Sequence, residues 1–212
     1  MDPQEVLQSV KDWIEATSEL LLTQSLTQSS LEQLSASDVD TIINQLRSLI
    51  STVDSLISTV DSLEAISTVC DALDLLLQVN GDMVDNRGEV LEILQMMLNQ
   101  FVLLNGDEVD EVVLVGKRLS QVVEQCGQGV FASQVLDGVA GHLLELVANE
   151  EAASSVRNSF LRALLFLASS TEIGDRERLG EEYVYDLDKL VDWLFSCGDY
   201  PTQAALIELL SR

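Results

Sequence analysis

The sequence LISTVDSLISTVDS, residues 49–62, contains one heptad written twice and decides the predicted fold. Side chains three and four residues apart share one face of an α-helix, so apolar residues at those steps form a continuous stripe. Ile43, Ile50 and Ile57 widen the stripe to that of a helix buried in a domain. We therefore interpret 38–79 as helical, about 60 Å long if unbroken at ~1.5 Å per residue. The stripe consists of Val39, Ile42, Leu46, Leu49, Val53, Leu56, Val60 and Leu63.

Turn residues divide the rest of the chain into segments of helical length. From residue 80 onward the predicted helix ends follow one another at intervals of 21 to 27 residues. One pair of helices about every 45 residues is the period of armadillo and HEAT arrays. We therefore predict an all-α fold, an armadillo/HEAT-like α-α superhelix of stacked helical hairpins, forming a single domain over 1–212. The expected helices are 2–22, a short one within 23–37, 38–79, 87–104, one reaching 126, 133–148, 150–169, 185–196 and one from 201.

The charge of the chain limits its partners. It has 36 acidic and 11 basic residues, a net charge of −25, and residues 1–111 hold 21 of the acids against three bases. Such a surface repels phosphate backbones, so we expect no direct nucleic-acid binding by this segment. The acidity either solvates an apolar-rich helical array or attracts a basic partner peptide. No run approaches the ~18 consecutive apolar residues of a membrane span, so no membrane contact is expected.

Residues that could carry chemistry do not form the pattern of an enzyme. His142 is the only histidine, and we interpret it as structural. Gly127-Gln128-Gly129 follows a helix and lacks the Gly-Lys-Ser/Thr ending of a phosphate loop, which favours an interhelical turn. The acidic segment 82–86 lacks the ligand spacing of a calcium loop. We predict no catalytic residue, no metal site and no cofactor.

Two further groups of residues have simple interpretations. Cys70, Cys126 and Cys197 are scattered without metal-ligand spacing and are typical of small apolar side chains in an intracellular, reducing compartment. A run of carboxylates surrounds Tyr183 and Tyr185, and we interpret 174–182 as a charged, solvated linker. These carboxylates belong to Asp175, Glu177, Glu181, Glu182, Asp186 and Asp188.

The heptad region has a second interpretation as a parallel two-stranded coiled coil over 39–63, through which the chain would self-associate. The outer heptad positions hold Ile43, Ile50 and Ile57 rather than charges, so ion pairs that select a partner are missing. The register also fails after Leu63. Packing within one chain is the favoured reading, and self-association is the alternative.

The last 23 residues, LVDWLFSCGDYPTQAALIELLSR at 190–212, carry a specific pattern. This pattern resembles the armadillo-like N-terminal domain of the synaptonemal complex protein 2 family, in which a helix ends at a Gly-Asp-Tyr turn and a helix with Gln and Glu-x-Leu-x-Arg follows. The matching residues, which we interpret as structural, are Gly198, Asp199, Tyr200, Gln203, Glu208, Leu210 and Arg212. Gly198 and Asp199 would cap the helices around the turn, and Tyr200 would anchor the turn in the core.

The resemblance implies a non-enzymatic scaffold of the meiotic chromosome axis, the lateral element of the synaptonemal complex in the nucleus. Its partners would be other proteins, bound in the groove of the helical array. Basic peptides are expected as partners from the acidity of the chain. The family's helical array continues and a pleckstrin-like domain follows it, so we expect this chain to end within the domain. The alternative function, from the residues themselves, is a structural protein that dimerises through the 39–63 helix.

Overall fold

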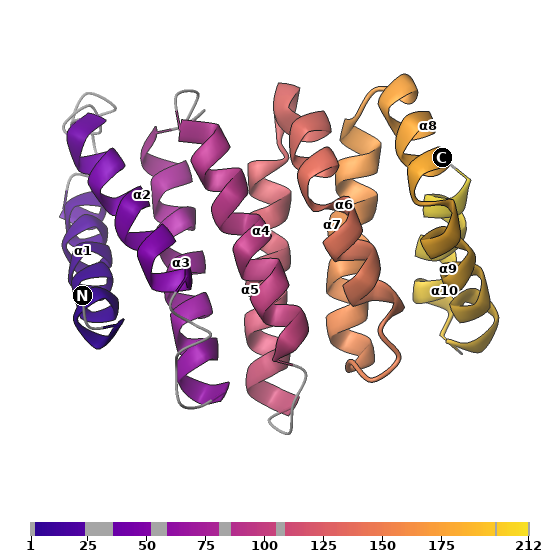
Figure 1. Ribbon diagram of the computed structural model, residues 1–212, viewed down its shortest axis with the longest axis horizontal. Coiled ribbons are helices and arrows are strands. Elements are labelled where there is room, and N and C mark those ends of the chain that lie inside the picture. Colours follow the sequence, from indigo (N-terminus) through magenta and orange to yellow (C-terminus); the bar gives the residue numbers. More distant parts are fainter. Residues whose placement is uncertain are drawn as a thin grey trace. The chain divides into compact units, whose positions relative to one another are not determined.

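The computed structural model describes residues 3–23, 36–51, 59–80, 86–104, 109–197 and 199–211, and the regular structure in these ranges is entirely helical. The predicted all-α class is therefore confirmed, and the packing of helix on helix is that of a helical repeat (Figure 1). The α-helices are α1 (Pro3–Thr23), α2 (Ala36–Ser51), α3 (Thr59–Asn80), α4 (Arg87–Leu103), α5 (Val109–Cys126), α6 (Ala132–Ala148), α7 (Ser154–Ser170), α8 (Ile173–Glu182), α9 (Val184–Ser196) and α10 (Tyr200–Leu210).

The chain divides into two compact units, Met1–Gln100 and Phe101–Arg212. In the first unit α1, α2 and α3 pack against one another (Figure 1). Val10, Leu46 and Ile66 are completely buried and represent the aliphatic core to which these three helices contribute. Polar contacts join the helices at the surface: Gln45 Nε2 donates to Ser9 Oγ at 3.3 Å, and Arg47 Nη2 lies 2.8 Å from Glu92 Oε2 of α4.

The sequence indicates helix over 38–79 and leaves open whether it is one helix. The described residues of this range form two helices, α2 and α3, which pack against each other, as the two halves of one straight helix cannot do. Leu46, Leu49 and Leu63 of the stripe are buried as predicted, but within the first unit. Residues 52–58 lie outside the described residues, and they include Val53, Leu56 and Ile57. They are the second half of the first LISTVDS copy and the first three residues of the second copy.

In the second unit α7 packs against α5, α6 and α10, and α9 packs against α6 and α10. The rings of Phe101 and Phe160 lie 5.6 Å apart between centroids and fill the space beside α5. Gly116 of α5 leaves the room for this pair, because a Cβ there would lie 3.0 Å from Cζ of Phe101.

Several boundaries follow the sequence prediction. Helix α3 ends at Asn80, α5 ends at Cys126, and α6 and α9 begin one residue before the predicted starts. Gly129 has a φ of 69°, so the Gly127-Gln128-Gly129 segment is the predicted interhelical turn. Helix α7 begins later than predicted, at Ser154, because the backbone N–H of Glu151 turns back to the side chain of Asn149. The short helix expected within 23–37 falls on residues 24–35, outside the described residues.

The predicted linker over 174–182 is helix α8. Its glycines and charges are typical of a linker, but contacts with another helix stabilise this segment as a helix. Arg178 forms ion pairs with Asp137 of α6 and, at 3.9 Å, with Glu182 one turn further along α8. Arg and Glu are good helix formers, so a charged segment that also finds partners on a neighbouring helix needs few apolar residues.

Candidate interaction surfaces

The turn between α9 and α10 holds the residues of the sequence motif. Asp199 is the N-cap of α10: its Oδ1 accepts a hydrogen bond from the backbone N–H of Thr202 at 2.8 Å. Hydrogen bonding with Thr202 lowers the pKa of Asp199. Gln203 Nε2 donates to the Leu194 carbonyl oxygen at 3.3 Å and so ties α10 to α9.

The remaining motif residues are not brought together into a site. Glu208 is exposed, and Leu210 is half-buried, while Gly198 and Arg212 lie outside the described residues. The expectation that Tyr200 anchors the turn is wrong, because its side chain is 81% exposed. Thr202 occupies the inward position instead: it is buried, and its hydroxyl donates to Asn158 Oδ1 of α7 at 2.7 Å.

Helix α9 exposes an apolar stripe that the sequence analysis did not identify. Val184, Val191 and Phe195 are all exposed, and Phe195 is 82% exposed. Their spacing of seven and four residues places them on one line of the helix. Asp188 and Asp192 are exposed beside this line. The spacing was visible in the sequence, but it does not tell an inward stripe from an outward one.

Helix α10, which packs against α9, exposes a second stripe. Tyr200, Ala204 and Ile207 follow one another at steps of four and three, and all three are exposed. Glu208 is exposed next to Ile207. We refer to Val184, Val191 and Phe195 together with Tyr200, Ala204 and Ile207 as the α9–α10 surface. Each stripe has exposed carboxylates beside it, and the two helices that carry the stripes pack together.

The predicted acidic patch around Tyr183 and Tyr185 is partly neutralised. Arg178 pairs with Glu182, and Lys189 Nζ lies 2.8 Å from Asp186 Oδ1 and 5.0 Å from the centroid of the Tyr185 ring. Burial and the surrounding carboxylates raise the pKa of Tyr183, so its hydroxyl stays protonated at neutral pH. These contacts lie where α8 meets α9.

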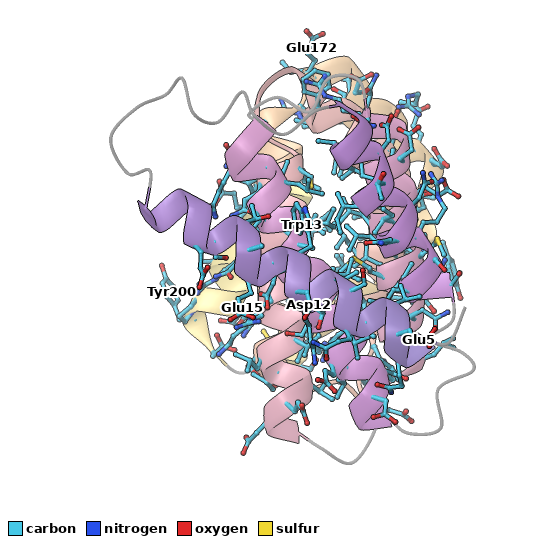
Figure 2. All side chains as sticks on the ribbon, turned by 90° about the vertical axis from the view of Figure 1, so that its left-hand side faces the viewer. Glu5, Asp12, Trp13, Glu15, Glu172 and Tyr200 are labelled. Carbon is cyan, nitrogen blue, oxygen red and sulfur yellow. The ribbon has the colours of Figure 1, made fainter. Side chains whose placement is uncertain are left out.

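In the first unit α1 presents an acidic face. Glu5, Asp12 and Glu15 are exposed along it, and Figure 2 looks directly onto this helix. Gln8 Nε2 donates to Asp12 Oδ1 at 2.7 Å on the same face. Trp13, beside these carboxylates in the sequence, is half-buried. The face accounts for part of the acidity of the N-terminal half.

A cavity of about 230 Å³ lies within the second unit, among α6, α7, α8, α9 and α10. Its wall is mostly aliphatic, and the polar side chains that line it are Arg176, Glu177 and Tyr183. Small residues create the space, namely Ala140, Ala168 and Gly180. The larger apolar residues of the wall are Leu136, Leu144, Leu164, Leu187, Leu209 and Leu210.

The remaining side chains that could react or bind a metal have structural environments. Burial raises the pKa of the Cys126 thiol to about 12, which keeps it protonated and unreactive. Cys70 is buried, and Cys197 is half-buried with its thiol 3.7 Å from the Leu194 carbonyl oxygen. His142 is half-buried on α6. In the described ranges no cluster of three or more His, Cys, Asp or Glu side chains could hold a metal, and no helix there could cross a membrane.

Comparison of the chain with family models, with curated proteins and with solved structures finds no match. The resemblance of 190–212 to the synaptonemal complex protein 2 family therefore stays a prediction.

Proposed function

We propose that this chain is a non-enzymatic protein-interaction scaffold that binds a partner through the α9–α10 surface. The observation that carries the proposal is the exposure of Phe195 and Tyr200, at 82% and 81%, on two helices that pack together. Large exposed apolar side chains that gather on one part of a surface are typical of a protein contact. Aromatic side chains that become buried when a partner binds contribute most of the affinity of an interface.

The carboxylates around these anchors define the partner. Asp188, Asp192 and Glu208 are exposed beside the two stripes. A partner helix with apolar residues on one face and Lys or Arg at its edges would bury its face on the stripes and pair its charges with these carboxylates. The charges act mainly on the association rate and on the choice of partner, and the apolar anchors on affinity.

The experiment is affinity capture from cells with matched variants, followed by mass spectrometry. Phe195→Ser with Ile207→Ser should remove the partner without unfolding the chain, because both side chains are exposed. Leu103→Ser with Leu114→Ser is the control, since these side chains are also large, apolar and exposed but lie outside the α9–α10 surface. A partner set unchanged by the first pair of substitutions would refute the proposal.

The more specific proposal is that the partner belongs to the meiotic chromosome axis. It is supported by the motif at 190–212, in which Asp199 and Gln203 make the turn contacts described above. Localisation of the tagged protein in meiotic nuclei tests it. Absence from chromosome axes would exclude this setting while leaving the general scaffold proposal open to the capture experiment.

A further inference from the structure

The cavity of the second unit has the composition of a small-molecule site. Its wall is aliphatic on α6, α7 and α10, and its polar side chains come from α8 and the residue that follows it. Ligand sites in proteins are typically apolar with a few polar groups that fix the orientation of the ligand. Packing defects between helices, in contrast, have no reason to include a guanidinium.

Arg176 is the polar group that decides the kind of ligand. Its side chain is half-buried, and its guanidinium forms no ion pair with a described residue. A partly buried guanidinium that finds no acceptor is unfavourable, and native proteins almost always provide one. Arg178, two residues further along the same helix, is exposed and paired with Asp137. The Arg176 guanidinium therefore lacks what its neighbour has, an oxygen acceptor.

We propose that this cavity binds a medium-chain fatty acid, with the carboxylate on Arg176 and the alkyl chain among the leucines of α6, α7 and α10. A carboxylate is the acceptor that matches the fork of a guanidinium. Tyr183 lines the same cavity, and its hydroxyl is protonated at neutral pH and hydrogen-bonded to Glu182. Glu177 also lines the cavity and is exposed, and its charge opposes the binding of a carboxylate.

The volume sets the length of the chain that fits. A cavity of about 230 Å³ corresponds to about eight water molecules at roughly 30 Å³ each. An alkyl chain of about eight non-hydrogen atoms fills such a space. Affinity should therefore increase about fourfold with each added methylene up to this length and then level off. Adsorption of an alkyl chain to an open surface shows no such limit.

Gly180 allows the cavity to be filled without disturbing the fold. It lines the cavity, and a Cβ built on it meets no atom within 4 Å. Gly180→Leu should therefore occupy ligand space and leave the helices in place. Gly174 is the matched control, because it is on the same helix, is equally open at the Cβ position and does not line the cavity.

The test is calorimetric titration of the whole chain with decanoate below its micellar concentration. The wild type and Gly174→Leu should bind one equivalent saturably, and Gly180→Leu should not bind. Arg176→Met should weaken decanoate about tenfold or more while leaving 1-decanol unchanged, and Arg178→Met should affect neither. Far-UV circular dichroism of each variant verifies that it is folded.

Three results would overturn the proposal. The first is no saturable binding by the wild type. The second is binding by Gly180→Leu equal to that of Gly174→Leu, which places the ligand outside the cavity. The third is an Arg176→Met variant that loses decanoate and 1-decanol equally, or neither, which removes the guanidinium as the carboxylate partner. None of these results bears on the α9–α10 surface, whose test uses different residues.

Discussion

The guanidinium carbon of Arg157 lies 3.8 Å from the centroid of the Trp193 ring, and this contact joins α7 to α9. The same side chain donates from Nε to the carbonyl oxygen of Val147, near the end of α6, at 2.8 Å. Both residues are buried, with exposed fractions of 7% each. One cation therefore satisfies a helix-end carbonyl and stacks on an aromatic ring, and it holds three helices of the second unit together.

Arg157→Lys should destabilise the chain by about 1–3 kcal/mol, because an ammonium group cannot stack flat on the ring and donate sideways to the carbonyl at the same time. Arg162→Lys on the same helix is the control and should change the free energy of unfolding by less than about 0.5 kcal/mol, since its side chain is exposed. Urea unfolding measures both. Equal effects of the two substitutions would contradict the structural role of Arg157.

Alanine should reduce the free energy of unfolding at Gly116 but not at Gly174. A Cβ on Gly116 would lie 3.0 Å from Cζ of Phe101 and 3.3 Å from Cγ1 of Val156, and the phenyl ring is buried against Phe160. Overpacking there should cost about 1–3 kcal/mol, more than the gain in helix propensity of up to ~1 kcal/mol. Gly174→Ala meets no atom within 4 Å and should be neutral or stabilising. Thermal unfolding of both variants measures these changes in stability. A stabilising Gly116→Ala would show that the Phe101 ring moves to make room for the added methyl group.

Helix ends marked by strong local signals were predictable from the sequence. Asn80, Cys126 and Gly129 end or separate helices as expected, because Asn and Gly tolerate the backbone conformations that stop a helix. Asp199 caps α10 as expected, since the cap depends on residues close in the sequence. Residues close in the sequence determine these helix ends, and packing against neighbouring helices has little effect on where they fall.

Features set by tertiary contacts were not predictable. Helix α8 is stabilised by the ion pair between Arg178 and Asp137, which are 41 residues apart. Tyr200 points outward because Thr202 takes the inward position against Asn158, and helical rotation places residues two apart on nearly opposite faces. The same rotation decides which stripe of α9 faces solvent. A sequence shows that a stripe exists, and only the packed neighbours decide which one is buried.

The division of 38–79 into two helices has the same origin. The heptad pattern continues across Ser51 and Thr59 without any Gly or Pro, so nothing local predicts a helix end there. Where α2 packs on α3 within the first unit, the described stripe residues Ile42, Leu46, Leu49 and Leu63 are buried. A single straight helix would have left much of the stripe without a partner in the same chain.

Glu124 gives a pH-dependent prediction. Burial raises its pKa above the ordinary 4.5, and the positive charge of Arg162 only partly offsets this. The folded state therefore holds the proton more tightly than the unfolded state, so this group's contribution to stability falls as the pH rises above 4.5 and through the raised pKa of the folded state. Glu124→Gln carries no such charge, and its stability relative to the wild type should increase between about pH 4 and pH 7.

Urea unfolding across this range measures the difference between Glu124→Gln and the wild type. Arg162→Gln is the companion variant: it removes the offsetting positive charge, so stability should fall more steeply with pH in Arg162→Gln than in the wild type. A difference between Glu124→Gln and the wild type that is constant with pH, or that decreases as the pH rises, would contradict the inferred burial of this carboxylate.

The chain should be monomeric at micromolar concentration. Ile42, Leu46 and Leu49, which a coiled coil would need at its seam, are buried within the first unit. Light scattering on the purified chain should therefore give the mass of one chain. A dimer that is lost on Leu56→Asp, at a position outside the described residues, would favour self-association through the heptad segment instead.

The charge of the chain predicts one interaction that should occur and one that should fail. Glu5, Asp12 and Glu15 form an exposed face on α1, and residues 1–111 carry 21 acids against three bases. A Lys/Arg-rich peptide should therefore associate with the chain at low salt and dissociate as salt rises, because screening acts over ~8–10 Å near physiological ionic strength. Replacing Asp12 and Glu15 by Asn and Gln should weaken this association.

Duplex DNA should not bind in the same buffer, because the chain offers few cations to displace the counterions of the phosphates. The basic residues of the second unit are already engaged in part: Arg157 is buried against Trp193, and Arg178 and Lys189 are paired with carboxylates. A gel-shift assay at low salt with the basic peptide as positive control makes the comparison. Retention of DNA by the chain would show that its remaining cations gather on one face.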